Sequence, residues 1–393
     1  MSWPTDKLGN LVTIKGGGTP SKNVKEYWNG DIPWASVKDL KSRLLLSTED
    51  SITPLGVEKS ATNLIPKGTI IVPTRMALGK VAVAGVDLAI NQDLKALFVN
   101  DEKVLDKAYF SRFLQSRAKY IESEGKGATV KGITLDFLKG LDVPLPPLNE
   151  QKRIAAILDK ADAIRQKRKQ AIDLAEEFLR SVFLDMFGDP VTNPKGWNTS
   201  TLDELVIGKF QNGAYFPKDQ YSMEGVEMVH MSDAFYNYVP RGSMKRVVVG
   251  DADLKKYKVN HKDILISRRS LSYDGAAKPS LIEASDRPLL FESSLIRITP
   301  NPKLINKLYL FSYLSNEIVK ENKIRKYVTG ATIKGISQKN LEKVEVLVPP
   351  TELQQKFANI FIKVEKLKTQ LHQSLLSRDM FQSLSQKAFL GQL

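Results

Sequence analysis

The sequence predicts an α+β protein in which two tandem, related domains are separated by a pair of long antiparallel coiled-coil helices, with pseudo-two-fold symmetry. Three observations in the 393 residues predict this architecture. An internal repeat runs along the chain, each copy opens with short β-like runs, and each copy closes with a long amphipathic segment.

The repeat is clearest in one seven-residue segment. Gly-Ala-Thr-Val-Lys-Gly-Ile at 127–133 returns as Gly-Ala-Thr-Ile-Lys-Gly-Ile at 330–336, which lies 203 residues later. The same separation joins Gln151 to Gln354, and earlier matches such as Trp3 and Trp197 lie 194 residues apart. An ordered series of matches with a slowly growing separation indicates a tandem duplication with small insertions in the second copy.

The first part of each copy is predicted to be a compact domain, over residues 1–146 and 195–348. Short β-like runs, punctuated by Gly, Pro, Asn and Asp, indicate several hairpins in each domain. These runs lie at 69–73, 80–84, 97–99, 246–249, 263–266 and 294–298. Short helices are expected at 106–123 and 305–323.

The second part of each copy is predicted to be a long helix, at 147–187 and 349–393, with a linker at 188–194 after the first. Asn149 can cap the first helix, and Gly188-Asp-Pro190 ends it. Apolar residues recur at coiled-coil spacing in both helices. They are Ile154, Ile157, Ala161, Ile164, Ala171, Ala175, Phe178 and Val182 in the first, and Phe357, Ile360, Val364, Leu367, Leu371, Phe381 and Ala388 in the second. Because the second helix starts near the far end of the first, the two can bury both stripes only by running antiparallel.

Composition and charge favour a polyanionic partner. Lys and Arg total 58 against 44 Asp and Glu, a formal net charge of +14. Such a chain gains binding free energy by neutralising phosphates and releasing counterions, so nucleic acid is the expected partner. Cysteine is absent and the three histidines are scattered, which disfavours disulfides and metal sites. No segment has the pattern of a membrane helix or a signal peptide, so no membrane contact and a cytoplasmic location are expected.

The motifs of common catalytic sites are missing from the sequence. There is no Gly-x-x-x-x-Gly-Lys-Ser/Thr phosphate loop, no His-Glu-x-x-His motif, no Gly-x-Ser-x-Gly motif and no Asn/Asp-Pro-Pro-Tyr/Phe tetrapeptide of amino-methyltransferases. Glu124-x-Lys126 and Glu321-x-Lys323 fit the end of a nuclease motif, but they are interpreted as solvated surface because 26% of the residues are charged. We therefore predict a binding protein with no catalytic residues, metal or cofactor.

Corresponding loops of the two copies supply the first candidate contacts to double-stranded DNA. The loops at 16–22 and 211–218 combine small residues, which allow close backbone approach to phosphate, with Lys22 and Lys218. Gln211 and Asn212 can read adenine edges with two hydrogen bonds. An ordinary turn is the alternative interpretation of these loops.

Two further pairs of segments carry cations at corresponding positions. The loops at 74–80 and 268–275 follow predicted strands directly, and their arginines suit guanine or phosphate. Lys131 and Lys334 belong to the seven-residue repeat, whose identity in both copies suggests phosphate clamping, although a turn that seats the helix is an equal alternative. The full candidate set is Lys15, Gly17, Thr19, Ser21, Lys22, Arg75, Lys80, Lys131, Gln211, Asn212, Tyr215, Lys218, Arg268, Arg269, Tyr273, Lys278 and Lys334.

Three stretches of the sequence resemble one known family. Leu145-Pro-Pro-Leu-Asn-Glu-Gln-Lys-Arg-Ile154, the run Gly-Gly-Thr-Pro-Ser21 with Tyr27-Trp28 and Ile32-Pro-Trp34, and the tail Gln386-Lys-Ala-Phe-Leu-Gly391 are similar to the specificity (S) subunit of type I restriction–modification systems. The resemblance covers essentially the whole chain. The second copy departs from it at Thr351-Glu-Leu-Gln-Gln355.

The resemblance implies a non-catalytic DNA-recognition subunit. Each domain would be a target recognition domain that reads one half of a bipartite, asymmetric site. The paired helices would set the gap between the halves and dock two methyltransferase subunits, and two restriction (translocase) subunits would complete the complex. Apolar helix positions that are expected to be exposed are the candidate docking contacts, although an equal alternative is that they serve only the pairing of the two helices. They are Leu158, Ile172, Leu179, Phe361 and Leu376.

Two other functions remain open at this point. A stand-alone sequence-specific or architectural DNA-binding protein would share the charge and the repeat. A nuclease with an unrecognised site would cleave DNA by itself in the presence of metal.

Overall fold

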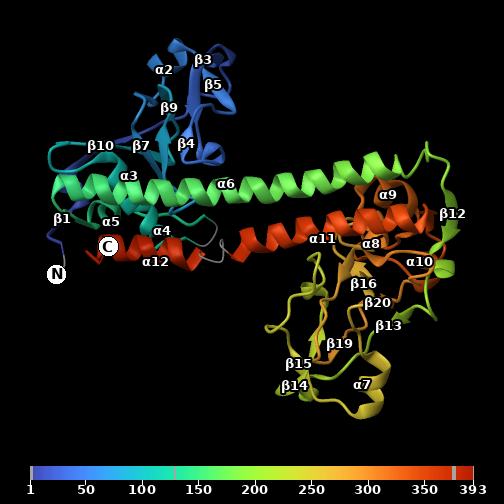
Figure 1. Ribbon diagram of the computed structural model, residues 1–393. Coiled ribbons are helices and arrows are strands. Elements are labelled where there is room, and N and C mark those ends of the chain that lie inside the picture. Colours follow the sequence, from blue (N-terminus) through green and yellow to red (C-terminus); the bar gives the residue numbers. More distant parts are fainter. Residues whose placement is uncertain (1–2, 128–129, 374–377, 393) are drawn as a thin grey trace. The chain divides into compact units, whose positions relative to one another are not determined.

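The chain forms two compact units in a computed structural model (Figure 1). Unit 1 consists of Met1–Lys169 and His372–Leu393, and unit 2 consists of Gln170–Leu371. The structure describes residues 3–127, 130–373 and 378–392. Each unit therefore has its own core, and the last segment of the chain belongs to the first unit.

Unit 1 contains three antiparallel or mixed sheets with helices packed beside them. The largest has the order β2-β10-β7-β8-β4, the second has the order β5-β3-β9-β6, and β1 pairs with β11. The strands are β1 (Thr5–Lys7), β2 (Val12–Gly16), β3 (Trp28–Ala35), β4 (Leu44–Leu45), β5 (Asp50–Ile52), β6 (Asn63–Ile65), β7 (Ile70–Pro73), β8 (Ala82–Ala84), β9 (Leu88–Ile90), β10 (Leu94–Val99) and β11 (Asp142–Pro144). The helices are α1 (Leu8–Leu11), α2 (Pro54–Glu58), α3 (Lys107–Ser116), α4 (Ala118–Ser123) and α5 (Leu135–Lys139).

Unit 2 contains the corresponding sheets. Their orders are β13-β20-β16-β18, β15-β14-β19 and β12-β22, with an added pair, β17-β21. The strands are β12 (Asn198–Thr201), β13 (Gln211–Asn212), β14 (Tyr221–Val229), β15 (Arg246–Val247), β16 (Ile264–Ser267), β17 (Arg269–Ser270), β18 (Pro279–Leu281), β19 (Leu289–Phe291), β20 (Leu295–Ile298), β21 (Lys334–Gly335) and β22 (Glu345–Val348). The helices include α7 (Asp251–Tyr257), α8 (Lys307–Ser315), α9 (Glu317–Val319) and α10 (Gln338–Glu342).

The two units repeat one topology, which confirms the predicted duplication and the α+β class. In both, the second sheet pairs a long strand in parallel with a later one, β3 with β9 and β14 with β19. In both, the same long strand also pairs antiparallel, with an irregular register, to β5 or β15. A mixed sheet with a bulge at the same place is improbable unless one fold occurs twice.

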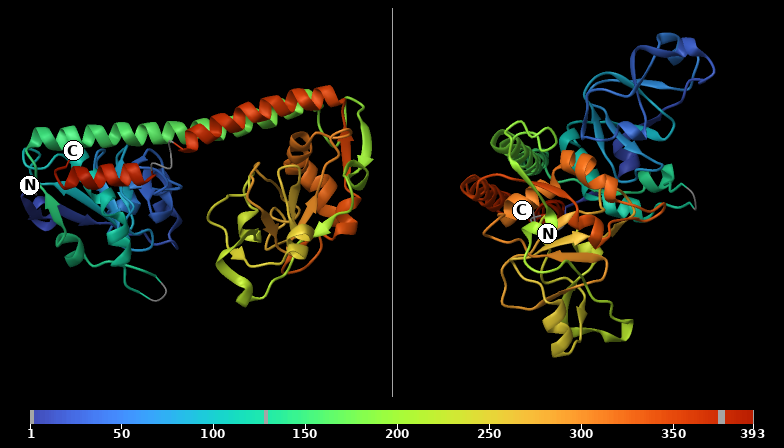
Figure 2. Two further views of the ribbon diagram at one scale, coloured as in Figure 1. Left: turned by 60° about the horizontal axis from the view of Figure 1, so that its bottom comes forward. Right: turned by 90° about the vertical axis from the view of Figure 1, so that its right-hand side faces the viewer.

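The predicted central helix is α6 (Leu148–Phe187), a single helix of 40 residues that contributes to both units. In unit 2 it runs antiparallel to α11 (Thr351–Gln373), and the two lie side by side in both Figures 1 and 2. The ring centroids of Phe183 and Phe357 are 5.6 Å apart, and nearer the other ends Lys368 Nζ lies 2.9 Å from a carboxylate oxygen of Glu176. These two contacts fix the antiparallel direction.

The tail was expected to be one helix over 349–393, and its described residues are helical in two stretches, between which residues 374–377 lie outside the described part of the chain. α11 ends at Gln373, and α12 (Arg378–Phe389) belongs to unit 1. Phe389 lies in the core of unit 1, with its ring 5.3 Å from Tyr109 and 5.6 Å from Phe113 on α3. The end of the chain therefore stabilises the domain that the start of the chain builds.

The predicted apolar stripe of the central helix is wrong at several positions. Ile164 and Phe178 are 42% and 52% exposed, and Leu367 on α11 is 49% exposed. Ile154 and Ala175 are buried as predicted, and the other buried apolar positions include Leu158, Ile172, Phe183 and Phe187, which were not in the predicted stripe. Their spacing follows 3.6 residues per turn, so over a helix this long the buried face departs from the heptad frame.

Among the helices of the described residues, none combines the length and the hydropathy that crossing a membrane requires.

Candidate nucleic-acid interface

Two of the predicted DNA-contacting segments are joined to each other in unit 2. The short strands β17 and β21 pair Arg269 with Gly335 and Ser270 with Lys334. The backbone N–H of Ile336 donates to the carbonyl of Arg268 at 3.0 Å. The arginine loop and the seven-residue repeat therefore form one surface, although some 60 residues separate them in the sequence.

The same junction occurs in unit 1. The N–H of Met76 donates to the carbonyl of Lys131 at 3.0 Å, and that of Ile133 donates to the carbonyl of Thr74 at 2.9 Å. Arg75 forms a β-bridge with Gly132. Arg75 and Lys131, both exposed, thus lie on neighbouring backbone segments, as do the exposed Arg269 and the partly buried Lys334 in unit 2.

The repeated segment is a hairpin turn that requires glycine. Gly127 and Gly330 have φ of 134° and 109°. A Cβ at Gly127 would lie 2.2 Å from the carbonyl oxygen of Val130, and one at Gly330 would lie 2.0 Å from that of Ile333. The turn therefore explains the two glycines, because only glycine fits there, and the role of the repeated lysine stays a prediction. Lys334 supports the same turn by donating to the carbonyls of Gly330 and Ala331 at 2.9 and 2.8 Å.

In unit 2 the joined loops form a cationic and aromatic surface around Tyr273. The ammonium of Lys334 lies 4.6 Å from the Tyr273 ring centroid, and the guanidinium of Arg325 lies 4.7 Å from it. Lys278 lies 5.8 Å from the ring of Phe235 and donates to its carbonyl. Arg325 was not predicted, because it lies outside the three loop pairs and only the fold brings it to Tyr273.

The first loop of unit 1 packs closely against the end of β9. A Cβ at Gly17 would lie 2.0 Å from the carbonyl oxygen of Ile90, so the backbone can approach there only at glycine. Beyond it, the hydroxyl of Thr19 donates to the side-chain oxygen of Gln92. Lys15 lies on the neighbouring strand β2, 5.3 Å from the ring centroid of Phe98. Ser21 is exposed and its carbonyl accepts from the indole of Trp28.

A pocket of about 280 Å³ opens beside this loop. It is lined by Thr19, Lys22, Trp34, Ser36, Lys38, Asn91, Gln92 and the carboxylate-bearing Asp50. Trp34 is 5% exposed and its indole N–H donates to the carbonyl of Gly18 at 3.0 Å. The pocket therefore combines an aromatic wall with amide, hydroxyl and ammonium groups.

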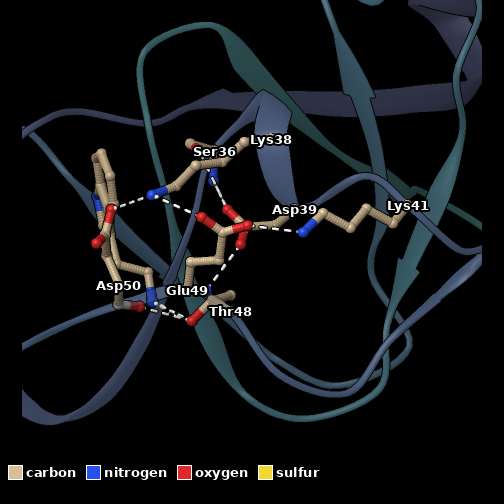
Figure 3. A network of polar contacts seen from close by, with 8 residues as sticks. Ser36, Lys38, Asp39, Lys41, Thr48, Glu49 and Asp50 are labelled. Atoms are coloured by element: carbon tan, nitrogen blue, oxygen red, sulfur yellow. Dashed lines mark hydrogen bonds and ion pairs between the residues drawn. The ribbon is translucent and has the colours of Figure 1, made fainter. Parts of the chain in front are cut away.

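A polar network holds the rim of this pocket (Figure 3). Lys38 lies 2.8 Å from Asp50 and 3.3 Å from Glu49, and Lys41 lies 2.7 Å from Glu49. Asp39 accepts from the backbone N–H groups of Ser36 and Glu49, both at 2.8 Å. The hydrogen bonds from Lys41 and Lys38 lower the pKa of Glu49, so the carboxylate stays ionised and paired. The acidic groups at the rim thus add little net negative charge.

Several predicted contacts are already engaged within the chain. The side-chain amide of Gln211 donates to the carbonyl of Lys256 at 2.9 Å, and its oxygen accepts from Arg297. The oxygen of Asn212 accepts from Gln338 at 3.0 Å. A two-bond contact to adenine would require Gln211 to release partners of both its nitrogen and its oxygen, and Asn212 to release the partner of its oxygen. The reading of adenine by these amides stays a prediction. Lys80 likewise donates to the carbonyl of Leu40 at 2.9 Å.

The remaining candidates of unit 2 lie at the surface. Tyr215 is 83% exposed, Lys218 and Arg269 are exposed, and Arg268 is partly buried. Gly213 packs on the carbonyl of Phe291, as Gly17 packs on that of Ile90 in unit 1.

The predicted docking residues are mostly core residues of this chain. Leu158 and Phe361 are 0% and 3% exposed and Ile172 is 8% exposed, so the expectation that they lie at the surface is wrong. Leu179 is partly buried against the core of unit 2, and Leu376 lies outside the described residues. Exposed apolar side chains on α6 are found instead at Leu174 and Phe178, which are 63% and 52% exposed.

The chain is similar in sequence and in fold to known proteins. The family model described as "Type I restriction modification DNA specificity domain" matches residues 2–174 and again 194–378. The MjaIX specificity subunit of Methanocaldococcus jannaschii is 25% identical over 100% of this chain and 93% of its own length. The EcoR124I/EcoR124II specificity subunit of Escherichia coli is 41% identical over 42% of this chain and 41% of its own length. The crystal structure of an S subunit from M. genitalium has the same fold, with a TM-score of 0.60, 17% identity and coverage of 99% of this chain and 96% of that one.

Proposed function

Because this chain belongs to the type I restriction–modification DNA specificity family, we propose that it selects the DNA on which a type I restriction–modification complex acts. The chain is a recognition subunit and not an enzyme. It binds a bipartite, asymmetric site, with one half of the site bound by each unit.

The observation that carries this proposal is the shared junction of the two units. Each unit joins an arginine loop to the repeated lysine hairpin through the same backbone hydrogen bonds. Cations held on a hydrogen-bonded frame suit phosphate contacts, which position a protein on DNA without reading its sequence. Because the chain has one such frame in each unit, it can contact DNA at two separate places.

The domain assignment follows the same reasoning. We assign residues 1–146 and 195–348 to two target recognition domains, 147–187 and 349–393 to spacer helices, and 188–194 to a linker. The antiparallel contacts of α6 and α11 support a spacer role for these helices. Deleting one heptad from both helices is expected to change the gap of the recognised site and to leave its two halves unchanged.

The partners are assigned from the relatives, whose names are those of subunits of type I restriction enzymes. We propose that two methyltransferase subunits and two restriction (translocase) subunits assemble with this chain, in the cytoplasm where the target DNA lies. No cofactor is assigned to the chain itself.

The test is to express the chain with the methyltransferase subunit of its own system and to map the methylated bases in the host DNA. A bipartite motif that disappears when this chain is omitted supports the proposal. Methylation that is unchanged without the chain would refute it.

A further inference from the structure

The backbone frame that borders the pocket of unit 1 recurs at the corresponding loop of unit 2. The N–H of Gly18 donates to the carbonyl of Ile90 at 3.0 Å, and the N–H of Ala214 donates to the carbonyl of Phe291 at 3.0 Å. Gly17 and Gly213 precede these donors, and neither has room for a Cβ. Gly18 therefore corresponds to Ala214, and the next residue of unit 1, Thr19, corresponds to Tyr215.

The facing turn is also the same in both units. The N–H of Asn91 donates to the carbonyl of Ala35 at 2.9 Å, and the N–H of Glu292 donates to that of Val229 at 3.0 Å. Each turn then closes with a bond from a leucine N–H, Leu94 to Asn91 at 3.2 Å and Leu295 to Glu292 at 3.0 Å. Asn91 and Gln92 therefore correspond to Glu292 and Ser293.

On this common frame the side chains differ in their hydrogen-bonding chemistry. In unit 1 the oxygen of Gln92 accepts from Thr19, which leaves the exposed amide N–H₂ of Gln92 as a donor beside the ammonium of Lys22. In unit 2 Ser293 replaces Gln92 and the phenol of Tyr215 replaces the hydroxyl of Thr19.

Unit 2 also offers an acceptor where unit 1 has an amide. One carboxylate oxygen of Glu292 accepts from the N–H of Met231 at 2.5 Å. The other oxygen of Glu292 has no hydrogen-bond partner assigned among the described residues, and the side chain is partly exposed. Beside the loop, unit 1 thus presents the donors of Gln92 and Lys22, next to an Asp50 carboxylate that is paired with Lys38, whereas unit 2 presents the second carboxylate oxygen of Glu292 as an acceptor.

This divergence contrasts with positions where the side chain serves the fold. Gly127 and Gly330 are the same residue because the turn requires it, and Gln151 and Gln354 are the same because they make the same buried bonds. At the pocket rim the backbone makes the shared bonds, so the fold leaves Gln92 and Ser293 free to differ. A polar side chain that the fold does not fix, placed beside cationic loops, is suited to reading a ligand.

We propose that these rim positions determine sequence specificity by contacting base edges, Thr19 and Gln92 in unit 1 and Tyr215, Glu292 and Ser293 in unit 2. This inference rests on the proposed function and adds the residues that distinguish the two half-sites. The donors of unit 1 favour a base edge rich in acceptors, such as guanine N7 and O6. The carboxylate of unit 2 favours a base edge with an amino group, such as cytosine N4.

The test exchanges a donor for an acceptor without removing the contact to Thr19. Gln92→Glu keeps an oxygen for the Thr19 hydroxyl and replaces the amide N–H₂ with a second oxygen. The variant is expressed with the methyltransferase subunit, and the methylated motif and the binding of half-site variants by the complex are measured. We expect preference at one position of one half-site to change by about ten- to a hundredfold, because a base contact of this kind contributes about 1–3 kcal/mol.

A second variant and a matched control keep the result interpretable. Gln92→Ser introduces the residue found at the corresponding position of unit 2, and it is expected to alter the same base position. Asn149→Asp adds the same charge at an exposed position in the first turn of α6, and it is expected to leave the motif unchanged.

The possible outcomes separate this inference from the proposed function. A changed half-site beside an unchanged second half-site and gap supports the rim as a reader. An unchanged motif in both Gln92 variants, or a uniform loss of affinity for all sequences, overturns the rim inference and leaves the proposed function intact. If the wild-type complex methylates no bipartite motif, the proposed function itself fails.

Discussion

Gln354 makes in unit 2 the same three hydrogen bonds that Gln151 makes in unit 1. In each case the side-chain oxygen accepts from the backbone N–H of a helix N-cap residue. This residue is Asp106 of α3, at 2.9 Å, or Asn306 of α8, at 2.7 Å. The amide nitrogen donates to two backbone carbonyls, those of Val104 and Pro146 or those of Leu304 and Pro349. Both glutamines are buried, at 1% and 0% exposure, so each fastens the start of a spacer helix to its domain.

Replacing either glutamine with leucine should therefore destabilise its unit. Gln151→Leu leaves one buried N–H and two carbonyls without their partner, and we expect a loss of about 2–4 kcal/mol. Thermal unfolding of the variant measures the effect. Gln166→Leu, at an exposed position of the same helix, is the control and should change stability by less than about 0.5 kcal/mol. Equal melting temperatures for the Gln151 variant and the wild type would contradict the role of this side chain.

The second prediction concerns Arg112, whose buried guanidinium joins α3 to α6 in unit 1. Its side chain is 3% exposed and lies 2.6 Å from Asp159 and 3.1 Å from Asp162. Arg112→Met removes the buried cation from the two carboxylates, but Asp159 keeps Arg43 and Asp162 keeps Arg165. We therefore expect a loss of about 1–3 kcal/mol. Arg153→Met breaks an exposed pair with Glu150 and should cost less than about 1 kcal/mol in the same unfolding assay.

This cluster also predicts a pH dependence. Burial raises the pKa of Asp159, but the hydrogen bonds from Arg112 and Arg43 lower it more, so the net pKa lies below its usual value. A carboxyl whose folded pKa is depressed contributes stability above its unfolded pKa, about 3.9, and loses that contribution as the pH falls through the folded value. Wild-type protein should therefore lose more stability than Arg112→Met between about pH 5 and pH 2. Parallel losses in the two proteins would show that the pair does not titrate as described.

Phe389 gives a further prediction, since it places α12 against the core of unit 1. Phe389→Ala removes the contacts to Tyr109 and Phe113, and we expect a loss of about 3–5 kcal/mol. The neighbouring Leu390 is 48% exposed, so Leu390→Ala is the matched control and should be nearly neutral. Limited proteolysis and thermal unfolding compare the two variants. A Phe389 variant as resistant as the Leu390 variant would rule out a stabilising role for α12.

The joined loops predict how DNA affinity depends on salt. Arg75→Ala and Arg269→Ala each remove an exposed cation next to the lysine hairpin, in unit 1 and unit 2 respectively. If each arginine neutralises one phosphate, binding to every sequence weakens to a similar extent and the slope of log K against log salt falls by about 1. Lys103→Ala, an exposed cation outside the loops, should leave the slope unchanged. A change in sequence preference would instead make these arginines base readers.

The last prediction concerns the partner subunits. Leu174 and Phe178 are exposed on α6, so Leu174→Ser with Phe178→Ser should change the stability of the isolated chain by less than about 1 kcal/mol. Exposed apolar side chains of this size are suited to interfaces, and we expect the double variant to bind the methyltransferase subunit at least about tenfold more weakly. Co-purification and titration measure the affinity. Full affinity would place the docking surface elsewhere.

The sequence by itself determined the duplication and the elements that depend on local chemistry. The repeated glycines Gly127 and Gly330 predicted a special backbone, and the structure shows the positive φ that demands it. The long helix α6 could be predicted because apolar periodicity and a Gly–Asp–Pro stop are local signals, although the helix begins at Leu148 and Asn149, the predicted cap, lies in its first turn.

Only the tertiary structure decided which faces are buried and which loops meet. Phe178 is exposed and Phe183 is buried because packing against Phe357 and Tyr309 selects the face of the helix, and a heptad count cannot see those partners. The sequence of the loop favours Gln211 as a base reader, but in the fold its amide nitrogen donates to the carbonyl of Lys256 and its oxygen accepts from Arg297. Contacts between segments far apart in the chain decide which polar groups are left to bind DNA, and a pattern within one segment carries no record of them.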